Sequence, residues 1–210
     1  MTTLISKEDN KTLSLITKNN LRILSSNRKR DFNFRYDSNA ILFGEQKPNI
    51  AEKFDIFLCH SSLDSDLILG LREYFQSLQF SVYIDWYNDP QLDRTQVNKA
   101  TADMLRLRMR ASSCLFFASS TNSPNSKWMP WECGYFDGTK GKVAICPIVE
   151  SSIQADNDNF QGQEYLGLYP YVANGVPMGG GAETLWIHEG PKKYVCFADW
   201  LRGKNPTTKI

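Results

Sequence analysis

Histidine is scarce in this 210-residue chain, and its two histidines, His60 and His188, lie far apart in the sequence. The five cysteines include no Cys-x-x-Cys pair. Zinc sites are built mainly from closely spaced cysteines and histidines, so we expect no metal site. The cysteine count is odd, and Cys59, Cys114 and Cys146 fall in apolar segments. Buried free thiols in a reducing cytoplasm explain this better than disulfides do.

An excess of one charge and long apolar runs are also missing. Lysine and arginine number 24 against 23 aspartates and glutamates, so we expect neither a nucleic-acid partner nor a membrane partner. No apolar run approaches the ~20 residues that a membrane-spanning helix needs. The first residues have neither the apolar core nor the cleavage site of a signal peptide. We therefore expect a cytoplasmic protein, long enough for one domain with additions.

Two kinds of apolar segment alternate from residue 54 onward. Compact runs are typical of buried strands, and apolar residues at helical spacing are typical of amphipathic helices. This alternation predicts an α/β fold with a central parallel five-stranded sheet and helices on both faces. The expected strands are Phe54–His60, Phe80–Asp85, Cys114–Ala118, Lys142–Val149 and Leu166–Val172. The expected helices are Asp64–Gln79, residues 97–111 and a third that opens at Pro130.

The two ends of the chain show this alternation less clearly. A weak apolar stripe predicts a short helix between Ser6 and Leu21. Near the other end, Leu185–His188 and Tyr194–Phe197 flank a Gly-Pro turn and predict a hairpin. The expected division is 1–50 for an N-terminal extension, 51–172 for the domain, and 173–210 for a glycine-rich loop and a C-terminal hairpin packed on the domain.

Ligands of parallel α/β sheets bind beyond the carboxyl ends of the strands. Residues 60–64, 85–94 and 119–132 leave the expected strands at that edge. Proline suits the first position of a helix, so a helix opening at Pro130 places Glu132 in the first turn, where the helix dipole favours negative charge. A carboxylate beside the broad face of Trp128, just outside that helix, suits a ligand with a flat ring and sugar hydroxyls. A capped helix with its tryptophans packed into the core is the structural alternative.

Three segments in order carry a family resemblance. Phe57–Asp64 has the sequence Phe-Leu-Cys-His-Ser-Ser-Leu-Asp, Val82–Asp85 has Val-Tyr-Ile-Asp, and Trp128 and Glu132 are spaced as Trp-x-x-x-Glu. Together they resemble the bacterial form of the Toll/interleukin-1 receptor (TIR) domain, whose first loop is usually Ser-His-Ala-Ser-x-Asp. Cys59 replaces the usual serine. The loop after Asp85 lacks the family's Leu-x-x-Gly.

The resemblance implies a flavodoxin-like TIR fold and an enzyme that breaks the nicotinamide–ribose bond of NAD without a metal. Such cleavage develops positive charge on the ribose, which a fixed carboxylate stabilises; Glu132 is the implied catalytic residue. The products would be nicotinamide and either ADP-ribose or a cyclic ADP-ribose isomer. The expected NAD-binding residues are His60, Ser61, Asp64, Asp85, Trp86, Arg94 and Trp128.

The resemblance also implies partners. The chain is similar in size to the stand-alone TIR component of the Thoeris antiphage system, which implies a diffusible product that reaches a separate effector. Trp86–Arg94 occupies the place of the BB loop, through which TIR domains self-associate, so charge reversal at Asp89 or Arg94 is expected to lower activity without unfolding the domain. Two alternatives stay open: a non-catalytic TIR scaffold that assembles with other TIR domains, and a nucleoside-processing enzyme on the same sheet topology.

Overall fold

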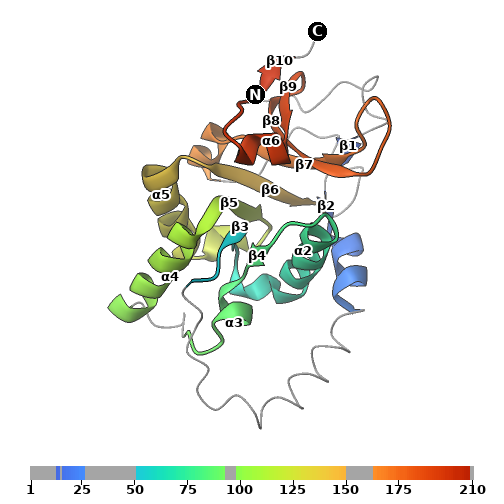
Figure 1. Cartoon of the computed structure of the whole chain (residues 1–210). Helices are drawn as coiled ribbons and strands as arrows, with labels where there is room; N and C mark the ends of the chain where they lie inside the picture. The colour runs from blue at the N-terminus through green and yellow to red at the C-terminus, as the bar shows by residue number, and fades with distance from the viewer. Residues whose placement is uncertain (1–12, 15, 27–50, 93–97, 150–162, 209–210) are drawn as a thin grey trace.

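The sheet of this protein has a parallel part whose strand order defines the fold. The computed structural model describes residues 13–14, 16–26, 51–92, 98–149 and 163–208 (Figure 1). Neighbouring strands of the parallel part all run in the same direction, and their order is 2-1-3-4-5 along the chain, as in flavodoxin-like folds. The predicted α/β fold is confirmed. The strands, in spatial order, are β4 (Val82–Tyr83), β3 (Phe54–Cys59), β5 (Ser112–Ser119), β6 (Val143–Val149) and β7 (Tyr171–Gly175).

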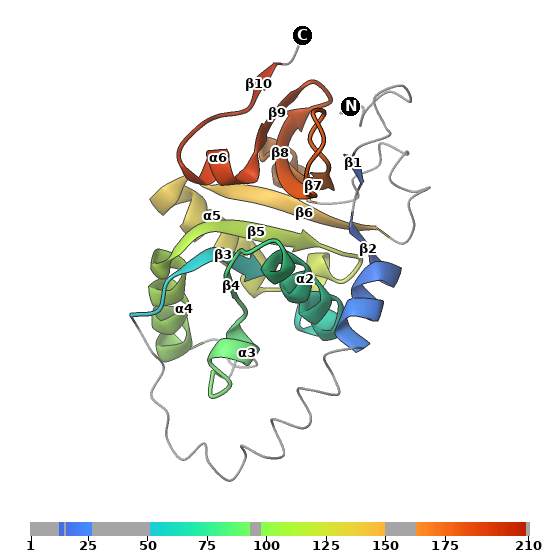
Figure 2. The ribbon, with the colours of Figure 1, turned by 45° about the vertical axis from the view of Figure 1, so that its right-hand side comes forward.

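Helices cover both faces of this sheet (Figures 1 and 2). The central strand β5 shows why, because successive side chains of a strand point to opposite faces. Phe116 lies in one core, and its neighbours Leu115 and Phe117 lie in the other. The first core is covered by α2 (Ser65–Ser77) and α6 (Phe197–Leu201), and the second by α4 (Lys99–Ala111) and α5 (Trp128–Lys140).

The sheet continues beyond β7 with antiparallel strands. These are β8 (Thr184–Gly190), β9 (Lys193–Cys196) and β10 (Thr207–Thr208). The pair β8–β9 is the predicted hairpin, which is confirmed. The antiparallel strands therefore belong to the same sheet as the parallel ones, and Figure 2 shows them curling away from β6.

The described part of the N-terminal region is tied to the sheet. β1 (Leu13–Ser14) pairs with β7, and β2 (Ile16–Thr17) pairs with the carboxyl end of β6. Residues 18–26 then form a helix beside α2. The two approach so closely that a Cβ atom at Gly70 would overlap the backbone of Leu21. The predicted helix between Ser6 and Leu21 is thus wrong for residues 13–14 and 16–17, which form strands.

Three predicted boundaries are also wrong. The fifth strand begins at Tyr171, because Pro170 has no N–H for the ladder and residues 164–168 form a 3-10 helix, η4 (Glu164–Leu168). The second strand ends at Tyr83, and Asp85 already opens a helical turn. Helix α5 begins at Trp128 rather than Pro130, since the Ser126 hydroxyl accepts the Met129 N–H at 3.3 Å.

Candidate active site

The loop that leaves β3 is fixed by two hydroxyl-bearing side chains and a carboxylate. The Ser61 hydroxyl accepts the Leu63 N–H at 3.3 Å and starts the short 3-10 helix η1 (Ser62–Asp64). The buried Asp64 carboxylate accepts a hydrogen bond from the Ser120 hydroxyl at 2.5 Å and another from the Asn122 amide at 2.7 Å. Ser120 and Asn122 follow β5, so Asp64 joins the loops of two neighbouring strands. These two hydrogen bonds fix the loops after β3 and β5 relative to each other at the carboxyl edge of the sheet.

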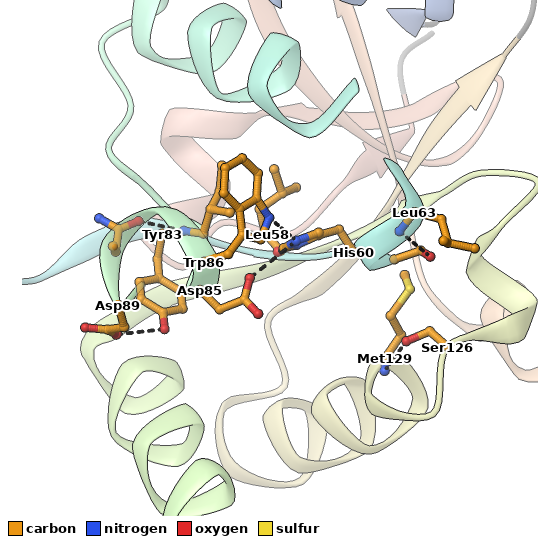
Figure 3. Close-up of polar contacts among 12 residues, drawn as sticks. Leu58, His60, Leu63, Tyr83, Asp85, Trp86, Asp89, Ser126 and Met129 are labelled. Atoms are coloured by element: carbon orange, nitrogen blue, oxygen red, sulfur yellow. Dashed lines mark hydrogen bonds and ion pairs between the residues drawn. The ribbon is translucent and has the colours of Figure 1, made fainter. Parts of the chain in front are cut away.

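His60 lies at the same edge, in a cluster with the residues that follow β4 (Figure 3). Its Nδ1 atom is 2.8 Å from the Leu58 carbonyl oxygen, and its Nε2 atom accepts the indole N–H of Trp86 at 2.9 Å. Asp85 Oδ1 lies 3.3 Å from the same Nε2. Asp85 and Trp86 are the first residues of α3 (Asp85–Asn88). The structure therefore brings together three of the residues that were predicted from the sequence.

Glu132 and Trp128 are in other surroundings than the sequence suggested. Glu132 is completely buried in the second turn of α5, so the predicted first-turn position, with its favourable helix dipole, is wrong. Trp128 is the first residue of the helix and is 9% exposed. Its ring meets Trp131 edge-on, with 5.4 Å between ring centroids. Trp128 is therefore a packed residue rather than an aromatic face standing outside the helix.

The start of α5 is anchored to the end of β3. The Cys59 thiol lies 3.7 Å from the Met129 carbonyl oxygen, and Cys59 is the residue before His60. The side chains of Cys59, Met129 and Trp128 belong to the core beneath α4 and α5, whereas Trp86 packs on the core beneath α2. Of the described residues that were predicted for the site, Trp86 and Trp128 thus pack on opposite faces of the sheet, and both lie near the carboxyl end of β3.

A buried ion pair lies directly after the helical turn α3. Arg108 of α4 donates two hydrogen bonds to Asp89, from Nε at 2.7 Å and from Nη2 at 2.6 Å, and the Tyr83 hydroxyl donates a third at 2.9 Å. The bond to Asp89 raises the pKa of Arg108. Asp89 has no exposed surface, so charge reversal at Asp89 would break this buried pair, and the expectation that it leaves the domain folded is wrong. The signal for this pair was a charge on the buried stripe of α4, between Leu105 and Met109.

Two further expectations concern residues or ligands at this edge. Arg94, the predicted pyrophosphate contact, lies outside the described residues. Within the part of the chain that the structure describes, no group of three or more His, Cys, Asp or Glu side chains is arranged to hold a metal ion. In the same residues, no helix is both long and apolar enough to cross a membrane.

The fold and the polar carboxyl edge are consistent with a TIR domain, and two known proteins are similar to this chain in sequence. The chain is 55% identical over 149 residues to "Probable 3' cyclic ADP-D-ribose synthase ThsB'" of Bacillus cereus (strain MSX-D12), covering 71% of this chain and 76% of that protein. It is 33% identical over 94 residues to "Putative cyclic ADP-D-ribose synthase TIR2" of Cytobacillus dafuensis, covering 44% of this chain and 24% of that protein. No family model matches the chain. The chain belongs to the family of Thoeris-like TIR domain proteins, as the sequence motifs predicted.

Proposed function

We propose that this protein is an enzyme that breaks the nicotinamide–ribose bond of NAD and forms a cyclic ADP-ribose isomer. The observation that carries the proposal is the similarity to the Bacillus cereus protein, whose name describes a cyclic ADP-D-ribose synthase. The anchoring of α5 to the end of β3 supports it, because it fixes the Trp-x-x-x-Glu segment at the edge of the sheet where ligands of such folds bind.

In the proposed reaction, Glu132 is the catalytic residue. The bond between the ribose carbon and the nicotinamide nitrogen breaks, and its electron pair leaves with nicotinamide, which departs as a neutral molecule. No strong general acid is needed for this leaving group. The ribose becomes positively charged, and the Glu132 carboxylate opposes that charge. A hydroxyl of the same ADP-ribose then attacks the carbon and loses its proton, which closes the ring; attack by water gives linear ADP-ribose instead.

The complete burial of Glu132 sets a condition on this mechanism. NAD can reach the carboxylate only after neighbouring side chains move, and we propose that association between copies of the chain supplies this movement. Nicotinamide release per subunit should then rise with protein concentration. A constant specific activity over a wide dilution series, from protein verified as monomeric, contradicts the association step.

The decisive variant is Glu132→Gln, which keeps the size of the side chain and removes its charge. Electrostatic groups of this kind are worth ~10²–10³ in turnover, so nicotinamide release should fall by about that factor. Asp137→Asn is the matched control, because Asp137 lies in the same helix and its carboxylate accepts the Tyr169 hydroxyl at 3.1 Å. A Glu132→Gln variant that keeps its melting temperature and cleaves within a few-fold of wild type excludes Glu132 as the catalytic group.

The same burial also favours a second function, a non-catalytic TIR scaffold in which Glu132 is a structural residue. Purified protein that binds other TIR domains but releases no nicotinamide from NAD would establish this function. For the enzyme, we propose that the product is a diffusible signal for a separate effector in antiphage defence. Infected cells that carry the wild type should accumulate the cyclic product, and cells that carry Glu132→Gln should not.

A further inference from the structure

The hydrogen bonds around His60 determine which ring nitrogen carries its proton. The Leu58 carbonyl oxygen can only accept, so Nδ1, at 2.8 Å, is the donor of that bond. A neutral imidazole carries one proton, which leaves Nε2 as an acceptor. Trp86 donates its indole N–H to Nε2 at 2.9 Å (Figure 3). Both nitrogens are therefore engaged within the protein.

Asp85 is the competing partner for the same nitrogen. Its Oδ1 atom lies 3.3 Å from Nε2, farther than the Trp86 nitrogen, and an ionised carboxylate has no proton to donate to an acceptor. The neutral ring therefore fits Trp86, and only a doubly protonated ring fits Asp85. His60 and Asp85 are both buried, at 2% and 3% exposed, so the pair has little freedom to rearrange around the indole.

The hydrogen bond to His60 matters because it fixes the orientation of the Trp86 indole. The indole plane meets the His60 ring at 75° and the Tyr87 ring at 73°, so neither ring stacks on the indole face. Trp86 is half-buried, at the start of the helical turn that follows β4. Trp86 also packs on the core beneath α2, so its N–H bond and this packing fix the plane of the indole, and stacking on a flat ring is favourable when the two planes are already aligned.

We propose that His60 is a positioning residue: its neutral imidazole fixes the indole of Trp86, which stacks on a flat ring of the dinucleotide substrate. This inference rests on the proposed function and gives it a substrate-binding element. It also changes the role of His60, which was predicted to contact NAD itself. Both of its nitrogens are engaged by Leu58 and Trp86, so its effect on the substrate passes through the indole.

The test compares steady-state nicotinamide release by the full chain and four variants. His60→Leu removes the acceptor and should raise KM for NAD about fivefold, the effect of losing one hydrogen bond, with kcat within about twofold. His60→Gln offers an acceptor near the position of Nε2 and should restore KM. Trp86→Phe should raise KM to a similar extent, and the double variant His60→Leu, Trp86→Phe should be no worse than Trp86→Phe. A double variant in which the two effects multiply overturns the inference, because the residues then act independently.

A second measurement does not depend on activity. In ¹⁵N-labelled protein, the indole N–H signal of Trp86, assigned by its loss in Trp86→Phe, should shift in His60→Leu and return in His60→Gln. Trp186→Phe is the matched control, since the Trp186 indole on β8 donates to the Gly175 carbonyl oxygen on β7 at 3.2 Å; the KM of this variant should stay at the wild-type value. An unchanged Trp86 signal in His60→Leu overturns the inference, whereas wild type that releases no nicotinamide overturns the proposed function instead.

Discussion

The two histidines of this chain are buried in different parts of one sheet, which use the imidazole ring in opposite ways. At the carboxyl edge of the parallel strands, His60 has both nitrogens in hydrogen bonds. In the antiparallel strand β8, the ring of His188 is stacked between Tyr171 and Tyr194, with 5.2 Å between centroids on each side. The Gly190 backbone is near that ring, but among the described residues neither nitrogen of His188 makes a hydrogen bond of normal geometry.

The sheet register explains this difference. Tyr171, His188 and Tyr194 are directly opposite one another on β7, β8 and β9, and opposite residues on neighbouring strands have side chains about 5 Å apart. The three flat rings therefore stack without any further device. His60 stands after the last residue of β3, where the chain turns and backbone and side-chain groups from other loops converge. The position in the sheet, rather than the residue type, decides whether a buried histidine acts as a polar group or as a flat ring.

The largest expected effect comes from breaking the charge pair beneath the parallel edge. Asp89→Ala leaves the Arg108 guanidinium buried without its carboxylate, which typically costs about 3–5 kcal/mol in the free energy of unfolding. Urea unfolding of wild type and variant measures this. The control is Asp103→Ala, which removes an exposed partner of Arg106 at 2.8 Å and should cost less than about 1 kcal/mol. If Asp89→Ala and Asp103→Ala lower the free energy of unfolding by the same amount, the buried pair is no more important for stability than the exposed one.

The second prediction concerns His188 in the antiparallel part of the sheet and the pH dependence of the free energy of unfolding. Burial lowers the pKa of His188 to about 4, from 6.5, so between these values the unfolded chain binds a proton that the folded chain does not. The contribution of the neutral His188 to the free energy of unfolding is therefore complete above pH 6.5. It decreases as the pH falls toward 4, by about 3 kcal/mol in all. His188→Phe keeps a flat ring and should lose this dependence. The prediction is wrong if the unfolding free energies of wild type and His188→Phe, measured from pH 7.5 to 4, change in parallel.

The sequence predicted the parts of the fold that rest on local patterns. The strands β3, β5 and β6 were predictable because each is a compact apolar run buried on both faces. β1 and β2 were not, since two-residue strands have no periodicity and Ile16 finds its partner, Ile148, far along the chain. The early start of α5 depends on a hydroxyl of Ser126, outside the apolar pattern.

The candidate site was predictable in composition but not in arrangement. Residue order along parallel strands placed His60, Asp85 and Trp86 at one edge, and the structure joins His60 to Trp86 by a hydrogen bond and places Asp85 beside the same ring nitrogen. Burial is a property of the whole packed chain, so the enclosure of Glu132 and the Asp89–Arg108 pair could not be derived from local spacing. A charged residue on the apolar stripe of a helix, such as Arg108, indicates that a buried partner of opposite charge lies next to it.

The smallest expected effect, the labelling of one thiol, compares the two parts of the sheet through their cysteines. Cys196, at the end of β9, is half-buried, while Cys59, Cys114, Cys133 and Cys146, in the parallel strands and α5, are buried. Burial raises the pKa of Cys133 to about 11 and that of Cys146 to about 12, which leaves little reactive thiolate near neutral pH. A thiol reagent at pH 8 should therefore modify one cysteine of the native protein quickly and the other four only after denaturant is added. Cys196→Ser should remove the fast reaction; if the fast reaction persists in this variant, the parallel core is open to solvent and the contrast between the two parts of the sheet does not hold.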